Sequence, residues 1–496
     1  MHMLDASLRM VDGELPHQDF MTPIGILGFA PVAAFLALGF GVGKATLLAN
    51  MAVAALLLPA TWWVGATRLT MAQAIVFGIG MVALLAAVVF GGGSTAISLS
   101  MFYNRWAWGV TFLVLATVLF PKKVALAEHL IAPLVIGLGM AILAMLKMTF
   151  FVPLAPVVIL ILFAQKRAGL AGWALLVGAM VGAILVGFLG VDFFKAYLGD
   201  LLAVTQSNSG RTSAGESFSA VVANPHTIVG SLVLLGSLLV FRKSGRMEQG
   251  LVILLLAPVF AYITYQNWGN DPKWLFIVIL YLWINLPDKG ELAAFRLPAR
   301  QSVLALLCVA TTLAIPSAIS LVTSPFRAAF ASTQGYELLP IRGEVSDIWL
   351  PEARVQNVVV RTGFEGMPAL LPEHELLEIN GFTFQDCRLT ETIVPMNLAM
   401  AKQVAALDFT KGQPVLTADV LNVSWLLADI TRVKGAAPWY YGDDAGLENT
   451  AYLMVPLCPI KTLLRDEMVA QFMDAGYGLN EVYSSSLMRL YEVAKP

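Results

Sequence analysis

Ten apolar stretches, each close to the length of a membrane-spanning helix, fill residues 45–323 and then stop. A helix needs about 20 apolar residues to cross the hydrocarbon core of a bilayer. Only a helix or a closed barrel satisfies its own backbone hydrogen bonds there. The sequence therefore predicts an integral membrane protein with a polar tail. The predicted spans are 45–64, 72–91, 107–120, 128–146, 148–164, 170–190, 226–241, 250–266, 274–287 and 303–323.

Composition agrees with a membrane protein. Hydrophobic residues make up 58% of the chain and charged residues 13%, whereas a soluble domain carries about 25% charged residues. The formal net charge is −2 and no basic block is dense, so we expect no nucleic-acid partner. Cys308 falls in a predicted span, and Cys387 and Cys458 fall in the tail. The last two either pair, if the tail faces an oxidising compartment, or remain free thiols.

Basic residues mark every second connection between the predicted spans. Because all of these loops can lie on one side, the positive-inside rule makes that side cytoplasmic. The other side then receives residues 1–44, loops 92–106 and 191–225, segment 266–273 and the whole tail. We expect a bacterial inner-membrane protein whose tail lies outside the cytoplasm. The basic residues are Arg68, Lys122, Lys123, Lys166, Arg167, Arg242, Lys243, Arg246, Lys289, Arg296 and Arg300.

Residues 23–41 are apolar enough to span, but a span here would move the N-terminal loop to the cytoplasmic side. Pro23, Gly25, Gly28 and Pro31 favour a broken helix that lies in the outer interface or re-enters it. The alternative is a simple eleventh span.

Three regions follow from this pattern. Residues 1–44 form an outer loop with an interfacial or re-entrant helix, 45–323 a helical transmembrane domain, and 324–496 a soluble domain. In the tail, short apolar runs alternate with helical patterns, which predicts an α/β domain. The expected fold is thus an α-helical polytopic membrane protein of ten or eleven spans with a C-terminal α/β domain. The aromatic stretch 438–442 either stacks on sugar rings or packs as a surface loop.

Polar residues gather at the predicted outer edge of the membrane, where they are costly unless they serve a function. Each group has a plainer reading, as a solvated loop or a snorkelling lysine. Because all of these groups lie on the predicted outer face, the sequence favours one outward cavity that binds an anionic, lipid-linked ligand. In it a solvated Arg105 would bind the phosphate. We assign Tyr103, Asn104, Arg105 and Lys147 to the donor phosphate, and His17, Gln266, Asn267, Asn270, Asp271 and Lys273 to the substrate.

The stretch LDASLRMVDGELPHQDFMTPIG, residues 4–25, is followed by an apolar segment. It resembles the first outer loop of the GT-C superfamily of membrane glycosyltransferases, which includes aminoarabinose transferases and protein mannosyltransferases. The resemblance covers roughly residues 1–323 and rests on pattern and topology. It implies a polyprenyl-phosphate-linked sugar donor, interfacial helices in the loop, and an outward soluble domain.

The chain departs from that superfamily in two places. There, a span precedes the loop and a catalytic Asp opens it, and here both would fall before Met1. We expect a start site further upstream, the alternative being a degenerate relative. Within the chain, Asp19 of the Asp-Phe pair or Asp5 is expected to be the catalytic carboxylate. Asn104 and Arg105 occupy the place of a second acidic residue, so no metal ligand is assigned and a role for a divalent cation stays open.

The leading hypothesis is sugar transfer from a polyprenyl-phosphate donor to a lipid, glycan or protein acceptor on the outer membrane face. An outward carboxylate would deprotonate the acceptor hydroxyl. A transporter or lipid flippase is the second hypothesis, and it predicts internal repeats and ionisable residues at mid-bilayer. The third is a non-catalytic envelope-assembly protein. No P-loop, zinc, Ser-His-Asp or dinucleotide motif is present.

Overall fold

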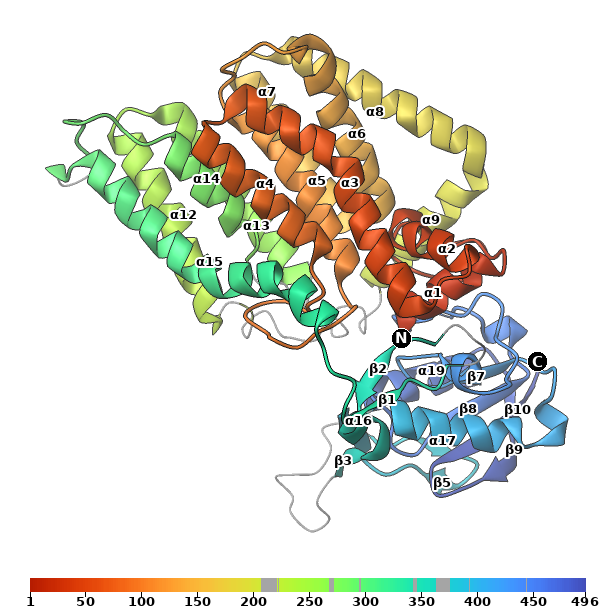
Figure 1. Ribbon diagram of the computed structural model, residues 1–496. Coiled ribbons are helices and arrows are strands. Elements are labelled where there is room, and N and C mark those ends of the chain that lie inside the picture. Colours follow the sequence, from red (N-terminus) through yellow and green to blue (C-terminus); the bar gives the residue numbers. More distant parts are fainter. Residues whose placement is uncertain are drawn as a thin grey trace.

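The computed structural model has a mostly helical N-terminal part and a smaller C-terminal part that contains the β-strands (Figure 1). The structure describes residues 1–206, 221, 223–266, 272–293, 296–341, 346–362, 375–391, 393–442 and 444–496. This architecture agrees with a polytopic membrane protein carrying a C-terminal α/β region.

A helix occupies each of the ten predicted spans. Six of them are long and apolar enough to cross a bilayer, namely α3, α6, α8, α12, α13 and α15. The apolar helices α4, α7 and α14 are shorter, and α5 is buried along its whole length. The ten are α3 (Val42–Arg68), α4 (Met71–Ala86), α5 (Phe102–Leu119), α6 (Glu128–Leu146), α7 (Met148–Ala164), α8 (Ala168–Leu189), α12 (Pro225–Lys243), α13 (Met247–Gln266), α14 (Leu275–Ile284) and α15 (Ala299–Ala329).

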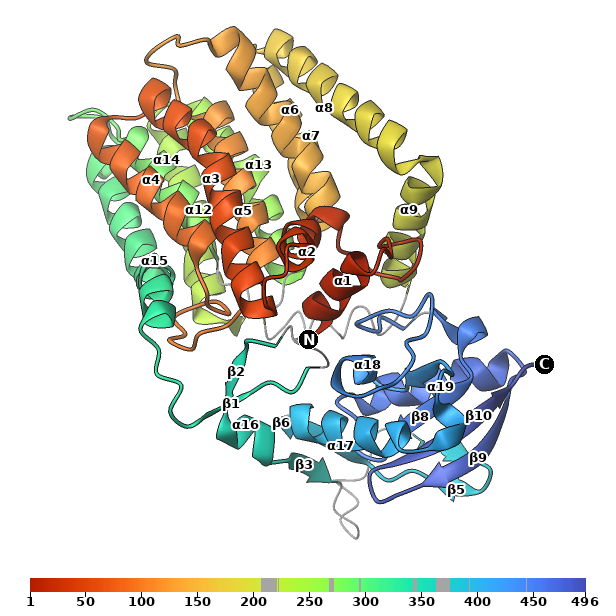
Figure 2. The ribbon, with the colours of Figure 1, turned by 45° about the vertical axis from the view of Figure 1, so that its right-hand side comes forward.

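The basic loops lie together at the end of the helical part that points away from the C-terminal part (Figures 1 and 2). At this basic end Glu128 accepts a hydrogen bond from Arg68 at 2.7 Å, and Arg167 lies 3.7 Å from the same carboxylate. Arg246 pairs with Glu291 at 2.7 Å. The opposite end, formed by loop 87–101, the turn at Lys147 and helix α9 (Val191–Gln206), is called the domain-facing end.

Residues 23–41 form no eleventh span. They contain a 3₁₀ turn, η1 (Ile26–Gly28), and the short helix α2 (Ala30–Ala37). Eight helical residues extend only about 12 Å. The Gly25 N–H donates to Leu146 O at 3.2 Å, and a Cβ on Gly25 would lie 2.1 Å from Met145 O. Glycine thus lets this broken segment lie directly on the turn between α6 and α7.

The C-terminal part is a small α/β fold that follows α15. Its main sheet has the order β7-β8-β10-β9, in which β7 and β8 are parallel and the other pairs antiparallel. Cys387 and Cys458 form a disulfide, so the free-thiol alternative does not hold. The strands are β1 (Tyr336–Leu338), β2 (Trp349–Pro351), β3 (Val359–Thr362), β4 (Glu378–Ile379), β5 (Phe382–Thr383), β6 (Cys387–Glu391), β7 (Val415–Thr417), β8 (Tyr452–Pro456), β9 (Gly478–Ser484) and β10 (Met488–Ala494). The helices are α16 (Glu352–Gln356), α17 (Ile393–Ala405), η4 (Asp408–Thr410), α18 (Ser424–Leu427), η5 (Leu447–Asn449) and α19 (Thr462–Asp474).

The N-terminal helix α1 (His2–Val11) joins the two parts and lies between them in Figure 2. Arg432 of the C-terminal part pairs with Asp12 at 2.5 Å and with Glu14 at 2.6 Å. The Gly435 N–H donates to Asp19 O at 2.9 Å. Much of the predicted outer loop is therefore in contact with the C-terminal part.

Candidate functional site

The turn between α6 and α7 carries a cation in a protein environment. The Lys147 amine donates to Asn104 Oδ1 at 2.7 Å and lies 4.9 Å from the centre of the Tyr103 ring. In the part of the chain that the structure describes, no carboxylate is within ion-pair distance of this amine. Although the residue as a whole is only partly buried, protein surrounds the amine, and this burial lowers the pKa of Lys147 to about 7.

Two further features of this turn suit an anion. Lys147 directly precedes α7, and the first N–H groups of a helix give its N-terminus a partial positive charge. The Thr149 hydroxyl oxygen is buried and has no hydrogen-bond partner among the described residues. An amine, a helix N-terminus and an unpaired hydroxyl can together bind a phosphate group. Three of the four residues assigned to the donor phosphate, Tyr103, Asn104 and Lys147, thus lie in contact.

A histidine–carboxylate pair lies beside this turn. His17 Nδ1 is 2.8 Å from Asp200 Oδ2, and the Thr22 N–H donates to the same oxygen at 3.0 Å. The imidazole stacks on the Tyr197 ring with 4.3 Å between centroids and meets the Phe193 ring edge-on. Burial raises the pKa of the Asp200 carboxyl, while its bonds to His17 and Thr22 oppose the rise.

The pair and the lysine share their supports. The Tyr197 hydroxyl donates to Ala144 O at 2.9 Å, three residues before Lys147. The Thr22 N–H donates to Asp200 and the Gly25 N–H donates to Leu146 O. The segment 17–25 thus connects the His17–Asp200 pair, called the dyad, to the α6–α7 turn. Asp200 was not predicted as a site residue, because its partner His17 is 183 positions away in the chain.

Arg105 differs from the expected solvated cation. It is 2% exposed, and its guanidinium donates to the carbonyls of Ala87 at 2.8 Å, Val89 at 2.6 Å and Ser100 at 3.3 Å. Carbonyl groups in loops often lack backbone hydrogen-bond partners, and one buried guanidinium, with its five N–H donors, can bond several of them at once. Arg105 therefore fixes loop 87–101, and the expectation that it lies open to solvent was wrong.

The two candidate carboxylates have different surroundings. Asp5 is fully buried, with Oδ1 accepting from Arg9 at 2.6 Å and Oδ2 accepting from Trp425 at 2.6 Å. Oδ1 is thus held within α1, and Oδ2 joins α1 to the C-terminal part. Asp19 accepts from the Leu15 N–H at 2.9 Å, and its side chain is 30% exposed. Of the two, only Asp19 has an oxygen that a substrate can approach.

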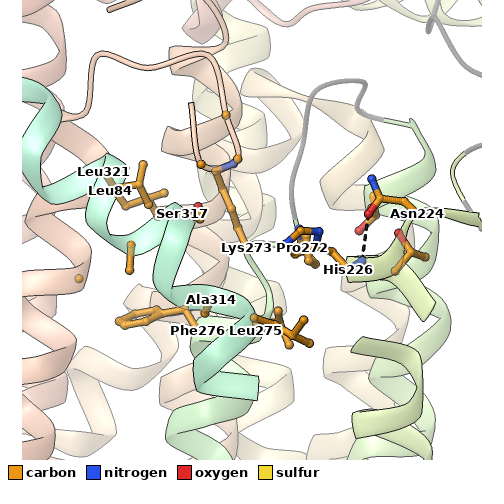
Figure 3. A pocket seen from close by; sticks show the side chains of 18 of the residues that line it. Leu84, Asn224, His226, Pro272, Lys273, Leu275, Phe276, Ala314, Ser317 and Leu321 are labelled. Atoms are coloured by element: carbon orange, nitrogen blue, oxygen red, sulfur yellow. Dashed lines mark hydrogen bonds between the residues drawn. The ribbon is translucent and has the colours of Figure 1, made fainter. Parts of the chain in front are cut away.

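A separate cavity of about 490 Å³ opens at the domain-facing end of the helical part. Figure 3 shows Leu84, Ala314 and Leu321 on one side of it and Asn224 and His226 on the other. Lys273 also lines it. The cavity is apolar among the helices and polar at its rim.

The residues predicted to share one outward cavity therefore do not share one. Neither His17, Asn104 nor Lys147 lines the cavity with Lys273, and α5 lies between, with Phe112 on the cavity wall. Gln266 is exposed at the end of α13 and does not line it either. Asn267, Asn270 and Asp271 lie outside the described residues.

Among the residues that the structure describes, no three His, Cys, Asp or Glu side chains gather as metal ligands. Comparison of the chain with protein-family models, with curated proteins and with solved structures found no match. The site must therefore be interpreted from its own chemistry.

Proposed function

We propose that this protein is a membrane glycosyltransferase that takes a sugar from a polyprenyl-phosphate donor, as the resemblance of residues 4–25 to the GT-C superfamily implies. The acceptor is a lipid, glycan or protein hydroxyl at the membrane face beside the C-terminal part. Lys147 and Asn104 contact the donor phosphate, and the polyprenyl chain lies along the apolar helices.

The observation that carries this proposal is the Lys147 amine, enclosed by protein at the end of two apolar helices with no carboxylate beside it in the described chain. A buried ammonium without a counter-ion is unfavourable, and a phosphate would supply the missing charge. When the sugar–phosphate bond breaks, negative charge grows on that phosphate, and a fixed cation stabilises it.

Two features support a location outside the cytoplasm for this site. The basic loops lie at the opposite end of the helical part, which the positive-inside rule would place in the cytoplasm. The Cys387–Cys458 disulfide in the C-terminal part suits an oxidising compartment, such as the outer side of a bacterial inner membrane.

Binding of polyprenyl phosphate tests the proposal without knowledge of the sugar, because every such donor contains this group. We expect saturable binding to the purified protein in lipid nanodiscs and at least tenfold weaker binding by Lys147→Met. The control is Lys195→Met, which removes an exposed lysine paired with Asp192 on α9. The proposal fails if the wild type does not bind or if Lys147→Met binds equally well.

The cavity with Lys273 favours a second candidate, a transporter or flippase for a lipid with a polar headgroup. Its apolar walls between helices and polar rim match an amphipathic ligand. This candidate predicts lipid movement between the leaflets of reconstituted vesicles without any glycosidic bond formed, which distinguishes it from sugar transfer.

A further inference from the structure

We propose that the His17–Asp200 pair is the general base that accepts the proton of the acceptor hydroxyl. This inference rests on the proposed glycosyltransferase function and replaces the sequence-based assignment of that role to Asp5 or Asp19. It is carried by the geometry of the imidazole, its support and its unused nitrogen.

The free nitrogen is the first observation. The His17 side chain is fully buried, and its Nε2 has no hydrogen-bond partner among the described residues. Buried polar atoms are nearly always paired, and leaving one unpaired is costly. A substrate hydroxyl that reached Nε2 would satisfy this atom by donating to it.

The second observation is the support that fixes the tautomer. His17 Nδ1 lies 2.8 Å from Asp200 Oδ2. An ionised carboxylate can only accept, so in a neutral imidazole bonded to it the proton lies on Nδ1 and the lone pair on Nε2. The Thr22 N–H also donates to Asp200 Oδ2, and the Tyr197 ring stacks on the imidazole. A base oriented by a carboxylate in this way stabilises the imidazolium that forms during proton transfer.

The backbone supplies the third observation. His17 has φ = +73°, in the left-handed region that non-glycine residues rarely adopt. Such strain persists where surrounding contacts enforce it and is concentrated at functional sites. Here the enforcing contact is the 2.8 Å hydrogen bond from the His17 N–H to Phe20 O, which closes the turn that aims the imidazole at Asp200.

The proposed step balances as follows. The acceptor oxygen forms a bond to the anomeric carbon while its proton passes to His17 Nε2. The bond between that carbon and the phosphate oxygen breaks, and its electron pair stays on polyprenyl phosphate beside Lys147. The imidazolium, held by the Asp200 carboxylate, then returns its proton to water. Because attack and departure occur on opposite sides of the carbon, the configuration inverts.

The test uses the full chain in nanodiscs, with polyprenyl-phosphate hexoses and pentoses labelled in the sugar, and membranes of the expressing cells as acceptor. His17→Gln and Asp200→Asn keep the shape of each side chain. We expect both to bind polyprenyl phosphate as the wild type does and to lose transfer by about 10²-fold or more. The double variant should lose no more than His17→Gln alone, because the two residues act as one unit.

Lys195→Met is the matched control, since it removes an exposed lysine on the same helix as Asp200, paired with Asp192. It should retain transfer. Wild-type transfer rates in either dyad variant would overturn the base assignment and leave the proposed function intact. Loss of both binding and transfer in the dyad variants, or equal loss in Lys195→Met, would show that the pair is structural. A wild type that neither binds nor transfers overturns both proposals.

Discussion

Lys147 carries a positive charge in a buried position, so its charge, and with it the affinity for an anion, should depend on pH. Because burial lowers its pKa to about 7, the amine of the free protein loses its proton as the pH rises above that value. A bound phosphate favours the charged amine, so binding must take up a proton at high pH. The affinity for polyprenyl phosphate should then fall by up to about tenfold per pH unit between pH 7 and 9.

Titration of polyprenyl phosphate binding at several pH values measures this effect. The phosphate itself changes little in this range, since its second pKa is near 6. Lys147→Arg keeps its charge at all these pH values and should bind with nearly constant affinity. An equally steep pH dependence in Lys147→Arg would show that another group is responsible.

Arg105 illustrates a residue whose role is set by its partners. Replacing it with Met should remove the guanidinium donor from the carbonyls of Ala87, Val89 and Ser100, of which Ala87 keeps a longer bond from Asn50 Nδ2 at 3.5 Å. A buried group left unpaired costs about 1–3 kcal/mol, so we expect a total loss of about 2–4 kcal/mol and a lower midpoint of thermal unfolding. Arg242→Met, at an exposed position in the last turn of α12, is the control. An unchanged midpoint in Arg105→Met would contradict the assigned role.

At the scale of elements, helix α3 begins with a cap supplied from far along the chain. Asp347 accepts from the Gly43 N–H at 2.5 Å and from the Lys44 N–H at 3.1 Å. A carboxylate here both pairs orphan N–H groups and complements the helix dipole. A Cβ on Gly41 would lie 2.5 Å from Asp347 Oδ2, so the approach also requires glycine.

Asp347→Ala should therefore destabilise the protein by about 1 kcal/mol, and Asp347→Asn should recover part of that loss because its side-chain oxygen still accepts. Hydrogen exchange of the Gly43 and Lys44 amides provides the local measurement. Exchange rates that stay the same in Asp347→Ala would show that the cap contributes nothing in solution.

At the scale of the whole molecule, the orientation in the membrane is the main open prediction. The basic loops lie at one end of the helical part and the C-terminal part at the other (Figure 2). We expect a reporter that works only in the cytoplasm to stay silent when fused after Pro496 and to be active when fused after Lys166, in a basic loop. Activity of the reporter at Pro496 would show the opposite orientation, with the proposed site on the cytoplasmic side.

The sequence by itself determined the helices and their order. Each of the ten apolar runs is a helix, because the length and hydropathy of a run are local properties and a bilayer leaves few other backbone conformations. The pattern of strands and helices in the C-terminal part also follows from local hydropathy. Local signals also predicted the broken segment 23–41, since Pro23 and Gly25 interrupt it.

Only the tertiary structure decided which polar residues meet. Asp5 contacts Trp425 over a separation of 420 residues, and His17 contacts Asp200 over 183. Hydropathy placed Arg105 at the outer edge of a helix, but its burial depends on how loop 87–101 folds over it. Side-chain partners of this kind follow from packing between distant segments. The helices and the group of Tyr103, Asn104 and Lys147 could be predicted from the sequence, whereas the partners of Asp5, His17 and Arg105 could not.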